Sequence, residues 1–328
     1  MSFDRYILNL RYKKVQGLGD KLPLMKEQID WKPFVPIVKS VFNDGTENGG
    51  RPHTDEIVIV RCLLLQAWYG LSDPELEFQV NDRLSFQNFL DFPERAPDFT
   101  TIWKIRDRLK NCGADKKIWA ELQRQLNAKG YIIRKGVIQD ASFIEAELGK
   151  KRYLKEKKAK KEGEKVDYTK KQDAHIDHDA SFAVKNGQVH YGYKRHIKLD
   201  VNYQFIRGYS ITPANVHDGD VDLVCLGDKK AYRDKGYFGK RIKSLCVEDK
   251  TMLRGRRGHP LTSAEKRRNS AIGRLRAPGE RPFSVMRCVF HNTATRVKNL
   301  ARVAIQQMFI FFAYNLFQLV TLKRKALA

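Results

Sequence analysis

Three carboxylates in the second half of the chain stand where catalytic side chains often stand. Asp140 ends the apolar run GVIQD, and Asp234 ends the run AYRD just before Gly236, which lets the chain turn sharply. Catalytic groups commonly project from the ends of strands, where a rigid backbone meets solvent. The third carboxylate, Glu280, is the only acidic residue after Glu265, in a tail rich in arginine and lysine. The three are therefore candidates for one site.

These carboxylates could converge on one or two Mg²⁺ ions, which prefer oxygen ligands, with Mn²⁺ as a possible substitute. Two such ions would activate an attacking water or 3′-hydroxyl and stabilise the leaving oxygen of a phosphodiester. The arginines around Glu280 would then contact the DNA backbone. Spacing alone leaves other roles open: Asp140 and Asp234 as turn or capping residues, and Glu280 as the salt-bridge partner of an arginine.

Composition favours a nucleic-acid partner. The 328 residues carry a formal net charge of +24, and Lys and Arg release counterions from phosphates when they bind. The five cysteines are scattered and form no Cys-x-x-Cys pair, which suits a reducing cytosol rather than a disulfide scaffold or a zinc ribbon. No secretion signal is expected in MSFDRYILNLRYKK, and MFIFFAYNLFQLV predicts a buried helix rather than a membrane span.

The first part of the chain is expected to be an all-α, helix-turn-helix-like DNA-binding domain over residues 1–125. Helices are predicted from Thr54 to Gly70, from a capping box at Ser72, and in TTIWKIRDRLKN, capped by Thr100 or Thr101. The last helix carries four basic residues, of which we single out two for DNA contact: Lys104, Arg106. A plain helical bundle with a solvated basic face is the alternative.

Residues 126–328 are expected to form a mixed sheet flanked by helices. Strands are predicted in GVIQD, QVHYGYKRHIKLDV, QFIRGYSITPA, AYRD and TMLRG, and helices in NVHDGDVDLVCLG, in GYFGKRIKSLC and after a capping box at Thr262 and Glu265. The charged stretch at about 149–172 has almost no large apolar residues, so we expect a basic mobile loop there.

Other polar residues compete for a functional role. Asp218 rivals Asp234 as the second carboxylate, although capping a following helix would explain it. The cluster Asp173, His175, Asp177, His178 and Asp179 could suggest zinc but is more typical of an exposed polar loop. His190 and His196 are interpreted as satisfied surface histidines. Lys194 and Arg195 could contact phosphate, or could lie on an ordinary solvated strand face.

An ordered set of motifs resembles a known family. QDASFIEA, VHYGYKRHIKLD, ITPANVHD, AYRDKGYFG and GERPFSVMR are similar to IS5-type bacterial insertion-sequence transposases, which have a DDE catalytic core with an RNase H-like fold. The stretches RPHTDEIVIVRCLLLQAWYGLSDPELEFQVNDRLSFQNFLDF and PDFTTIWKIRDRL are similar to that family's N-terminal helical domain. The resemblance covers roughly Gly45 to Leu319.

The resemblance implies that Asp140, Asp234 and Glu280 are the catalytic, metal-binding triad. The family's Arg-x₃-Glu-x₆-Lys pattern is met by Arg276, Glu280 and Arg287, with arginine in place of the usual lysine, and Gly273 stands where tyrosine is common. Prolines beside Glu280 predict that a helix restarts there. The candidates for DNA contact are as follows: Lys104, Arg106, Lys194, Arg276, Arg287.

The expected function is that of a Mg²⁺-dependent DNA transposase. It would bind the terminal inverted repeats of an insertion sequence, hydrolyse the element ends and join the freed 3′-hydroxyls to target DNA. Pairing two ends implies a homo-oligomer, and the expected location is the prokaryotic cytoplasm, at the nucleoid. Two alternatives stay open: a catalytically inactive, transposase-derived DNA-binding repressor, and a structure-selective nuclease of the same fold.

Overall fold

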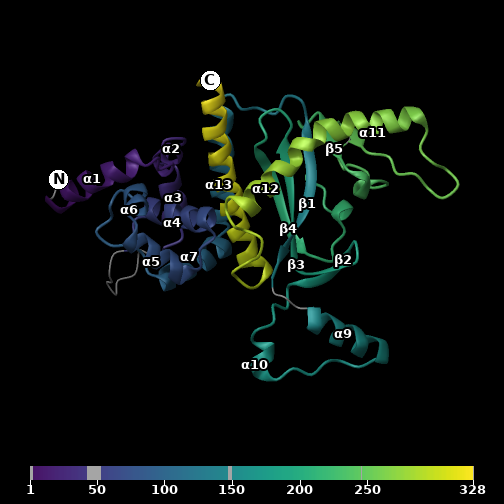
Figure 1. The fold of residues 1–328 in the computed structure, drawn as a ribbon, viewed down its shortest axis with the longest axis horizontal. Coiled ribbons are helices and arrows are strands. Elements are labelled where there is room, and N and C mark those ends of the chain that lie inside the picture. The colour runs from purple at the N-terminus through teal and green to yellow at the C-terminus, as the bar shows by residue number, and fades with distance from the viewer. Residues whose placement is uncertain (1–2, 43–52, 147–149, 245, 328) are drawn as a thin grey trace. The chain divides into compact units, whose positions relative to one another are not determined.

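A computed structural model describes residues 3–42, 53–146, 150–244 and 246–327, and its mixed α/β architecture is the expected one (Figure 1). The chain forms two compact units. The first comprises Met1–Ile132, Val285–His291 and Ile305–Ala328, and the second comprises Ile133–Ser284 and Asn292–Ala304. The predicted domain division at residue 125 stays a prediction, because no independent observation tests it.

The first unit is helical. Its helices before residue 132 are α1 (Phe3–Gly17), α2 (Leu22–Lys26), α3 (Phe34–Lys39), α4 (Glu56–Tyr69), α5 (Asp73–Asp82), α6 (Leu84–Phe89), α7 (Phe99–Asn111) and α8 (Ala114–Ala128). Ser72 caps α5 as predicted, and Gly70, with a φ of 62°, ends α4. The N-caps of α4 and α7 are Asp55 and Asp98, so the predicted threonine caps are wrong. Aspartate is the N-cap in both helices because its carboxylate accepts hydrogen bonds from backbone N–H groups of the first turn.

The core of the first unit gathers around α4 and the C-terminal helix α13 (Leu300–Leu327). The ring of Phe34 lies 5.6 Å from that of Phe312, and the ring of Trp68 lies 6.0 Å from that of Phe317. Helix α13 is long and apolar enough to cross a membrane, but 78% of its most apolar window is buried inside the protein. The prediction of a buried helix is therefore confirmed.

The second unit is built on a six-stranded mixed sheet among the described residues (Figure 1). The strands are β1 (Val137–Glu145), β2 (Ser181–Lys185), β3 (Gln188–Asp200), β4 (Ile206–Pro213), β5 (Lys230–Arg233) and β6 (Glu248–Thr251). Their order is β2-β3-β1-β5-β6, and β4 also pairs with β3. Strands β2, β3 and β4 are antiparallel to their partners, whereas β1, β5 and β6 run parallel to one another.

The register of the central strands aligns two of the candidate carboxylates. Val137 pairs with Ala231 and Ile138 with Tyr232, so the same register two residues further on brings Asp140 level with Asp234. Strand β1 continues to Glu145, so Asp140 lies within it rather than at its end. The prediction missed this because Ser142 and Glu145 break the apolar run but still pair with β3.

Two predicted helices in the second unit are absent from the described residues. Residues 215–227 contain only the single turn η1 (Asp218–Asp220), and residues 236–246 contain only the end of the turn η2 (Lys235–Tyr237). Local side-chain bonds replace the helical ones: Asp222 accepts from the Val224 backbone, and Asp234 accepts from that of Gly236. Strand β6 also lies earlier than predicted, because its pairing with β5 begins at Glu248.

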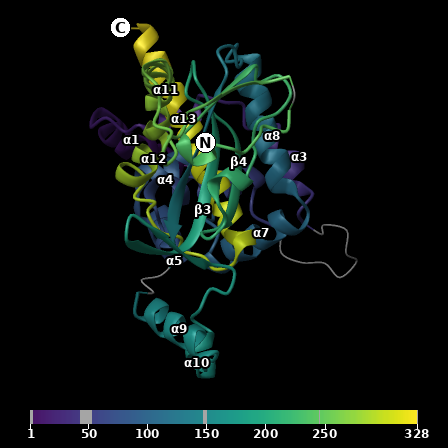
Figure 2. The ribbon, with the colours of Figure 1, turned by 90° about the vertical axis from the view of Figure 1, so that its right-hand side faces the viewer.

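A helix forms where a loop was predicted. Residues 150–162 form α9 (Lys150–Glu162), and α10 (Lys170–Asp173) follows; residue 149 lies outside the described residues. Ion pairs one turn apart, Arg152 with Glu156 and Lys158 with Glu162, support α9 without an apolar core. We call residues 150–176 the basic arm. In both views it stands away from the sheet (Figures 1 and 2).

A new helix begins at Glu280, as predicted. Helix α11 (Ser263–Arg276) opens with the predicted capping box at Thr262 and Glu265. The 3₁₀ turn η3 (Ala277–Gly279) follows, and α12 (Glu280–Cys288) begins at Glu280 itself. Proline at residue 282 sits in the first turn of α12, where its missing N–H costs no helical bond.

Candidate active site

Asp140 is a largely buried carboxylate on β1, with 15% of its side chain exposed. Its Oδ2 accepts a 2.8 Å hydrogen bond from Nη2 of Arg276, and its Oδ1 accepts from the backbone N–H of Ala141. The pKa of Asp140 is raised to about 6, mainly by burial and in smaller part by the charges of Glu280 and Asp234, against the lowering effect of Arg276. Three candidate carboxylates therefore lie close enough to interact electrostatically.

Asp234 follows β5 directly, as predicted. Its backbone ends the strand, and its Oδ1 accepts a 2.7 Å hydrogen bond from the N–H of Gly236 at the start of η2. The sharp turn holds the carboxylate beside the end of β5, next to β1. The predicted capping role is present, and it is compatible with a second role for the outer carboxylate oxygen.

Glu280 is exposed and makes no ion pair among the residues that the structure describes. Its position depends on Gly279, which is buried against β1: a methyl group there would lie 3.0 Å from Cγ2 of Ile138. Ile138 and Asp140 share one face of β1 because side chains alternate along a strand. This close approach brings Glu280 toward Asp140. The predicted alternative, an ion pair between Glu280 and an arginine, is not seen among the described residues; Arg276 forms an ion pair with Asp140.

The chemistry of these three residues fits a hard divalent cation. All three donors are carboxylates, the ligands that Mg²⁺ and Mn²⁺ prefer, and their mutual repulsion favours a bound cation. Within the described part of the chain, however, no three His, Cys, Asp or Glu side chains are grouped as a finished metal site. The Arg276 guanidinium occupies an oxygen of Asp140 that a cation would need.

Tyr237 is a buried neighbour of the site that the sequence did not reveal. Burial raises the pKa of its phenol above the ordinary value, and the charges of Asp140, Asp218 and Asp234 raise it further. The phenol is therefore neutral and lies near several carboxylates. Its place three residues after Asp234 was the one available signal.

Lys194 faces the interior rather than solvent. Its ammonium group donates to the carbonyl of Val216 and pairs with Asp218, each at 2.8 Å. His196 is fully buried, so its interpretation as a surface histidine is wrong; burial lowers its pKa to about 4, and it contacts Thr212. Asp218 thus pairs with a partly buried lysine instead of capping a helix.

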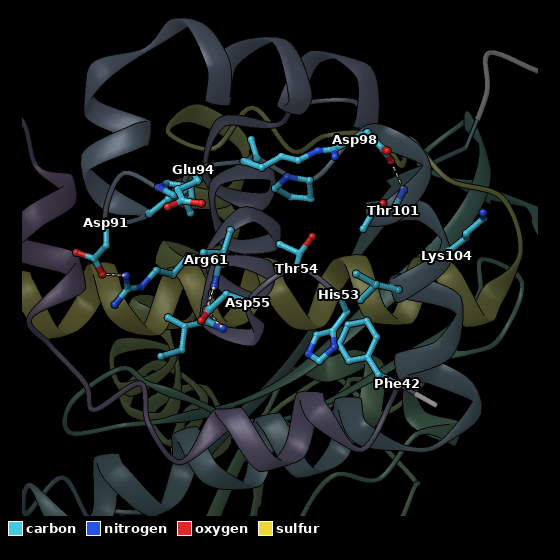
Figure 3. Close-up of a pocket in the computed structure, with 18 of the residues that line it drawn as sticks. Phe42, His53, Thr54, Asp55, Arg61, Asp91, Glu94, Asp98, Thr101 and Lys104 are labelled. Atoms are coloured by element: carbon cyan, nitrogen blue, oxygen red, sulfur yellow. Dashed lines mark hydrogen bonds and ion pairs between the residues drawn. The ribbon is translucent and has the colours of Figure 1, made fainter. Parts of the chain in front are cut away.

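The prediction that Arg106 of α7 contacts DNA is wrong. Its side chain is 2% exposed, and its guanidinium donates to Asp73 and Gln66. A guanidinium buried in this way does not face phosphate. Lys104, in contrast, is exposed and lines a cavity of about 930 Å³ in the first unit (Figure 3).

The remaining predicted residues are divided between surface and interior. Arg287 is exposed in the last turn of α12. His190 is bonded to Glu145 at 2.6 Å and stacks on Phe143. In the cluster that was expected to be an exposed polar loop, Asp173, His175, His178 and Asp179 are exposed as predicted. The interpretation is wrong for Asp177 alone, which is buried and accepts a hydrogen bond from the Tyr193 hydroxyl.

Comparison with known protein families identifies two domains in the chain. A family model described as a transposase domain matches residues 10–108, and a model described as a transposase DDE domain matches residues 132–316, more than half of the chain. No solved structure matches the chain. The mixed sheet is the RNase H-like core expected of such enzymes. The chain belongs to the DDE transposases, a family of DNA-cleaving and strand-transferring enzymes.

Proposed function

We propose that the protein is an IS5-type transposase that binds the terminal inverted repeats of its own insertion sequence. It hydrolyses the element ends to free 3′-hydroxyls and joins these to target DNA. Asp140, Asp234 and Glu280 hold the divalent cations, Mg²⁺ with Mn²⁺ as a substitute. Two copies of the chain pair two ends, and the reaction takes place in the cytoplasm, at the nucleoid.

One observation carries this proposal: Asp140 and Asp234 are level on neighbouring parallel strands, and the charge of Glu280 acts on the same carboxyl. The three come from segments far apart in the sequence. Clustered like charges cost stability, so such a group is more typical of a functional site than of a structural one.

The reaction requires a rearrangement of the residues around Asp140. When bound, divalent cations would activate the attacking oxygen and stabilise the leaving one. Asp140 must be deprotonated and free of Arg276 before both of its oxygens can serve as ligands. A DNA phosphate is a competing partner for Arg276, because a guanidinium pairs with phosphate as well as with carboxylate. In this mechanism Arg276 exchanges Asp140 for the DNA backbone, and Lys104 and Arg287 add further phosphate contacts; Lys194 supports the site through Asp218.

The proposal is tested with Asp140→Asn, Asp234→Asn and Glu280→Gln. Each variant should cleave a DNA duplex carrying the element end more than about 100-fold more slowly, since even residues outside the ligand set commonly cost 10–100-fold. Binding of the duplex, measured by gel shift, should persist. The matched control is Asp220→Asn, an exposed carboxylate paired with Lys240, which should cleave normally.

The wild-type protein could instead bind the element end in a gel shift and never nick it with Mg²⁺ or Mn²⁺. That result would contradict the proposed enzymatic activity and favour the inactive repressor. The ion pair between Arg276 and Asp140 is the observation that keeps this alternative in view. Normal cleavage by any of the three carboxylate variants would contradict the assignment of that residue.

A further inference from the structure

The basic arm is the most strongly charged element of the second unit. Residues 150–165 contain nine basic and three acidic residues, a net charge of +6. Few of its side chains pack against the rest of the unit, and both views show it apart from the sheet (Figures 1 and 2). Nine basic residues thus exceed what the three acidic residues of the same stretch can neutralise.

One face of α9 is held in place. The Arg152 guanidinium lies over Tyr191, 4.0 Å from the ring centroid, and over Phe182 at 5.0 Å. The hydroxyl of Tyr168, on the returning segment, donates to Glu156 at 2.9 Å. These contacts fix the arm at its base, and with it the direction in which the opposite face points.

The opposite face of α9 is a row of exposed lysines. Residues at steps of three and four share one face of a helix, which groups Leu154, Lys157, Lys158 and Lys161, all exposed. Lys160 flanks this face. Among the described residues, the ammonium groups of Lys160 and Lys161 have no carboxylate within ion-pair distance. Lys158 pairs with Glu162, and the Lys157 ammonium lies over the ring of Tyr153. Lys160 and Lys161 are therefore the charges on this side of the described helix that no carboxylate neutralises.

We propose that this lysine face of the arm docks on the phosphate backbone of duplex DNA. A helix of 13 residues is about 20 Å long, which spans roughly five or six phosphates of one strand. Lysines act as point charges and read no base pattern, so the arm adds affinity without adding sequence preference. The inference rests on the proposed function for DNA as the polyanion, and it assigns a second surface away from the carboxylates.

The test uses the full chain without divalent cations, so that cleavage cannot occur. Lys157, Lys158, Lys160 and Lys161 are changed together to Gln in one variant and to Arg in the control, which keeps the charge. Dissociation constants for an element-end duplex and for a scrambled duplex are measured between about 50 and 200 mM salt, where each lost phosphate contact lowers the salt slope by about 0.9.

The Gln variant should bind both duplexes about tenfold or more weakly at about 100 mM salt, with a slope reduced by about 2 to 4, while the Arg variant binds like wild type. All four side chains are exposed and only Lys158 forms an ion pair, itself on the surface, so thermal melting should change little. An unchanged slope in the Gln variant would overturn the inference, as would a loss confined to the element end. If the wild-type protein bound neither duplex, the proposed transposase function itself would be contradicted. Failure of the arm inference can therefore be distinguished from failure of the proposed function.

Discussion

At the scale of single residues, the site depends on one carboxyl whose surroundings oppose its charge. Burial raises the pKa of Asp140 to about 6, and Arg276 holds it below the value that burial and two acidic neighbours alone would give. Because this folded-state pKa lies above the unfolded value near 3.8, the folded state binds more protons between pH 4 and 6. The carboxyl therefore costs stability as the pH rises through that window.

Changing Arg276 to Gln should raise the pKa of Asp140 further, because the positive charge that favours the carboxylate is removed. The measurement is the ¹³C carboxyl shift of aspartate-labelled, metal-free protein as a function of pH, with the Asp140 signal assigned from its loss in Asp140→Asn. The wild type should titrate near pH 6 and the variant above it. A wild-type midpoint near 4, or a variant midpoint below the wild type, would contradict the account.

The sequence identified the three carboxylates but not what each one contacts. Asp234 and Glu280 could be singled out from a strand end and from isolation in a basic tail. The pair of Arg276 with Asp140 joins residues 136 positions apart, and no local pattern encodes it. The burial of Arg106 was readable, because Ile102 and Leu109, three or four residues away, mark the same face of α7 as buried.

At the scale of elements, the site depends on how closely the turn between α11 and α12 approaches β1. Gly279→Ala should push this turn from Ile138 by a few tenths of an ångström, because the added methyl meets Cγ2 at 3.0 Å. We expect cleavage to fall about tenfold, since small misplacements of catalytic groups are costly, with a loss of about 1 kcal/mol in the free energy of unfolding.

Gly273→Ala is the matched control for this change. Gly273 lies in α11, and a methyl group there would meet nothing within 4 Å. The substitution should leave cleavage unchanged and stabilise the helix by up to about 1 kcal/mol. Rates from a time course of end cleavage, together with thermal melting, separate the two variants. Equal cleavage by Gly279→Ala and wild type would show that this approach does not position Glu280.

Elements with a repeating pattern were predictable, and those shaped by local side-chain bonds were not. Apolar and polar residues alternate along β3, β4 contains isoleucine, tyrosine and threonine, and α11 follows its capping box. Residues 215–227 had the same apolar content as a helix, but aspartate side chains bond to nearby backbone there. Helix α9 was missed because pairs of opposite charge one turn apart, rather than apolar burial, support it.

At the scale of the whole molecule, a strongly positive net charge is combined with a small group of carboxylates in the second unit. The net charge of +24 attracts DNA, and the acidic group needs cations to approach it. The composition predicted the partner, and the resemblance to a family predicted the chemistry. Neither could predict that Arg276 would donate to a carboxylate oxygen of Asp140.

The central claim is that Asp140, Asp234 and Glu280 bind the same cations when DNA is present. Its most direct test replaces Mg²⁺ by Fe²⁺ in the complex with an element-end duplex, then adds peroxide so that radicals formed at the bound iron cut the polypeptide nearby. We expect cuts near residues 140, 234 and 280 together, all suppressed by excess Mg²⁺ and weakened in Glu280→Gln. Cuts at only one of these segments, or at unrelated ones, would contradict it.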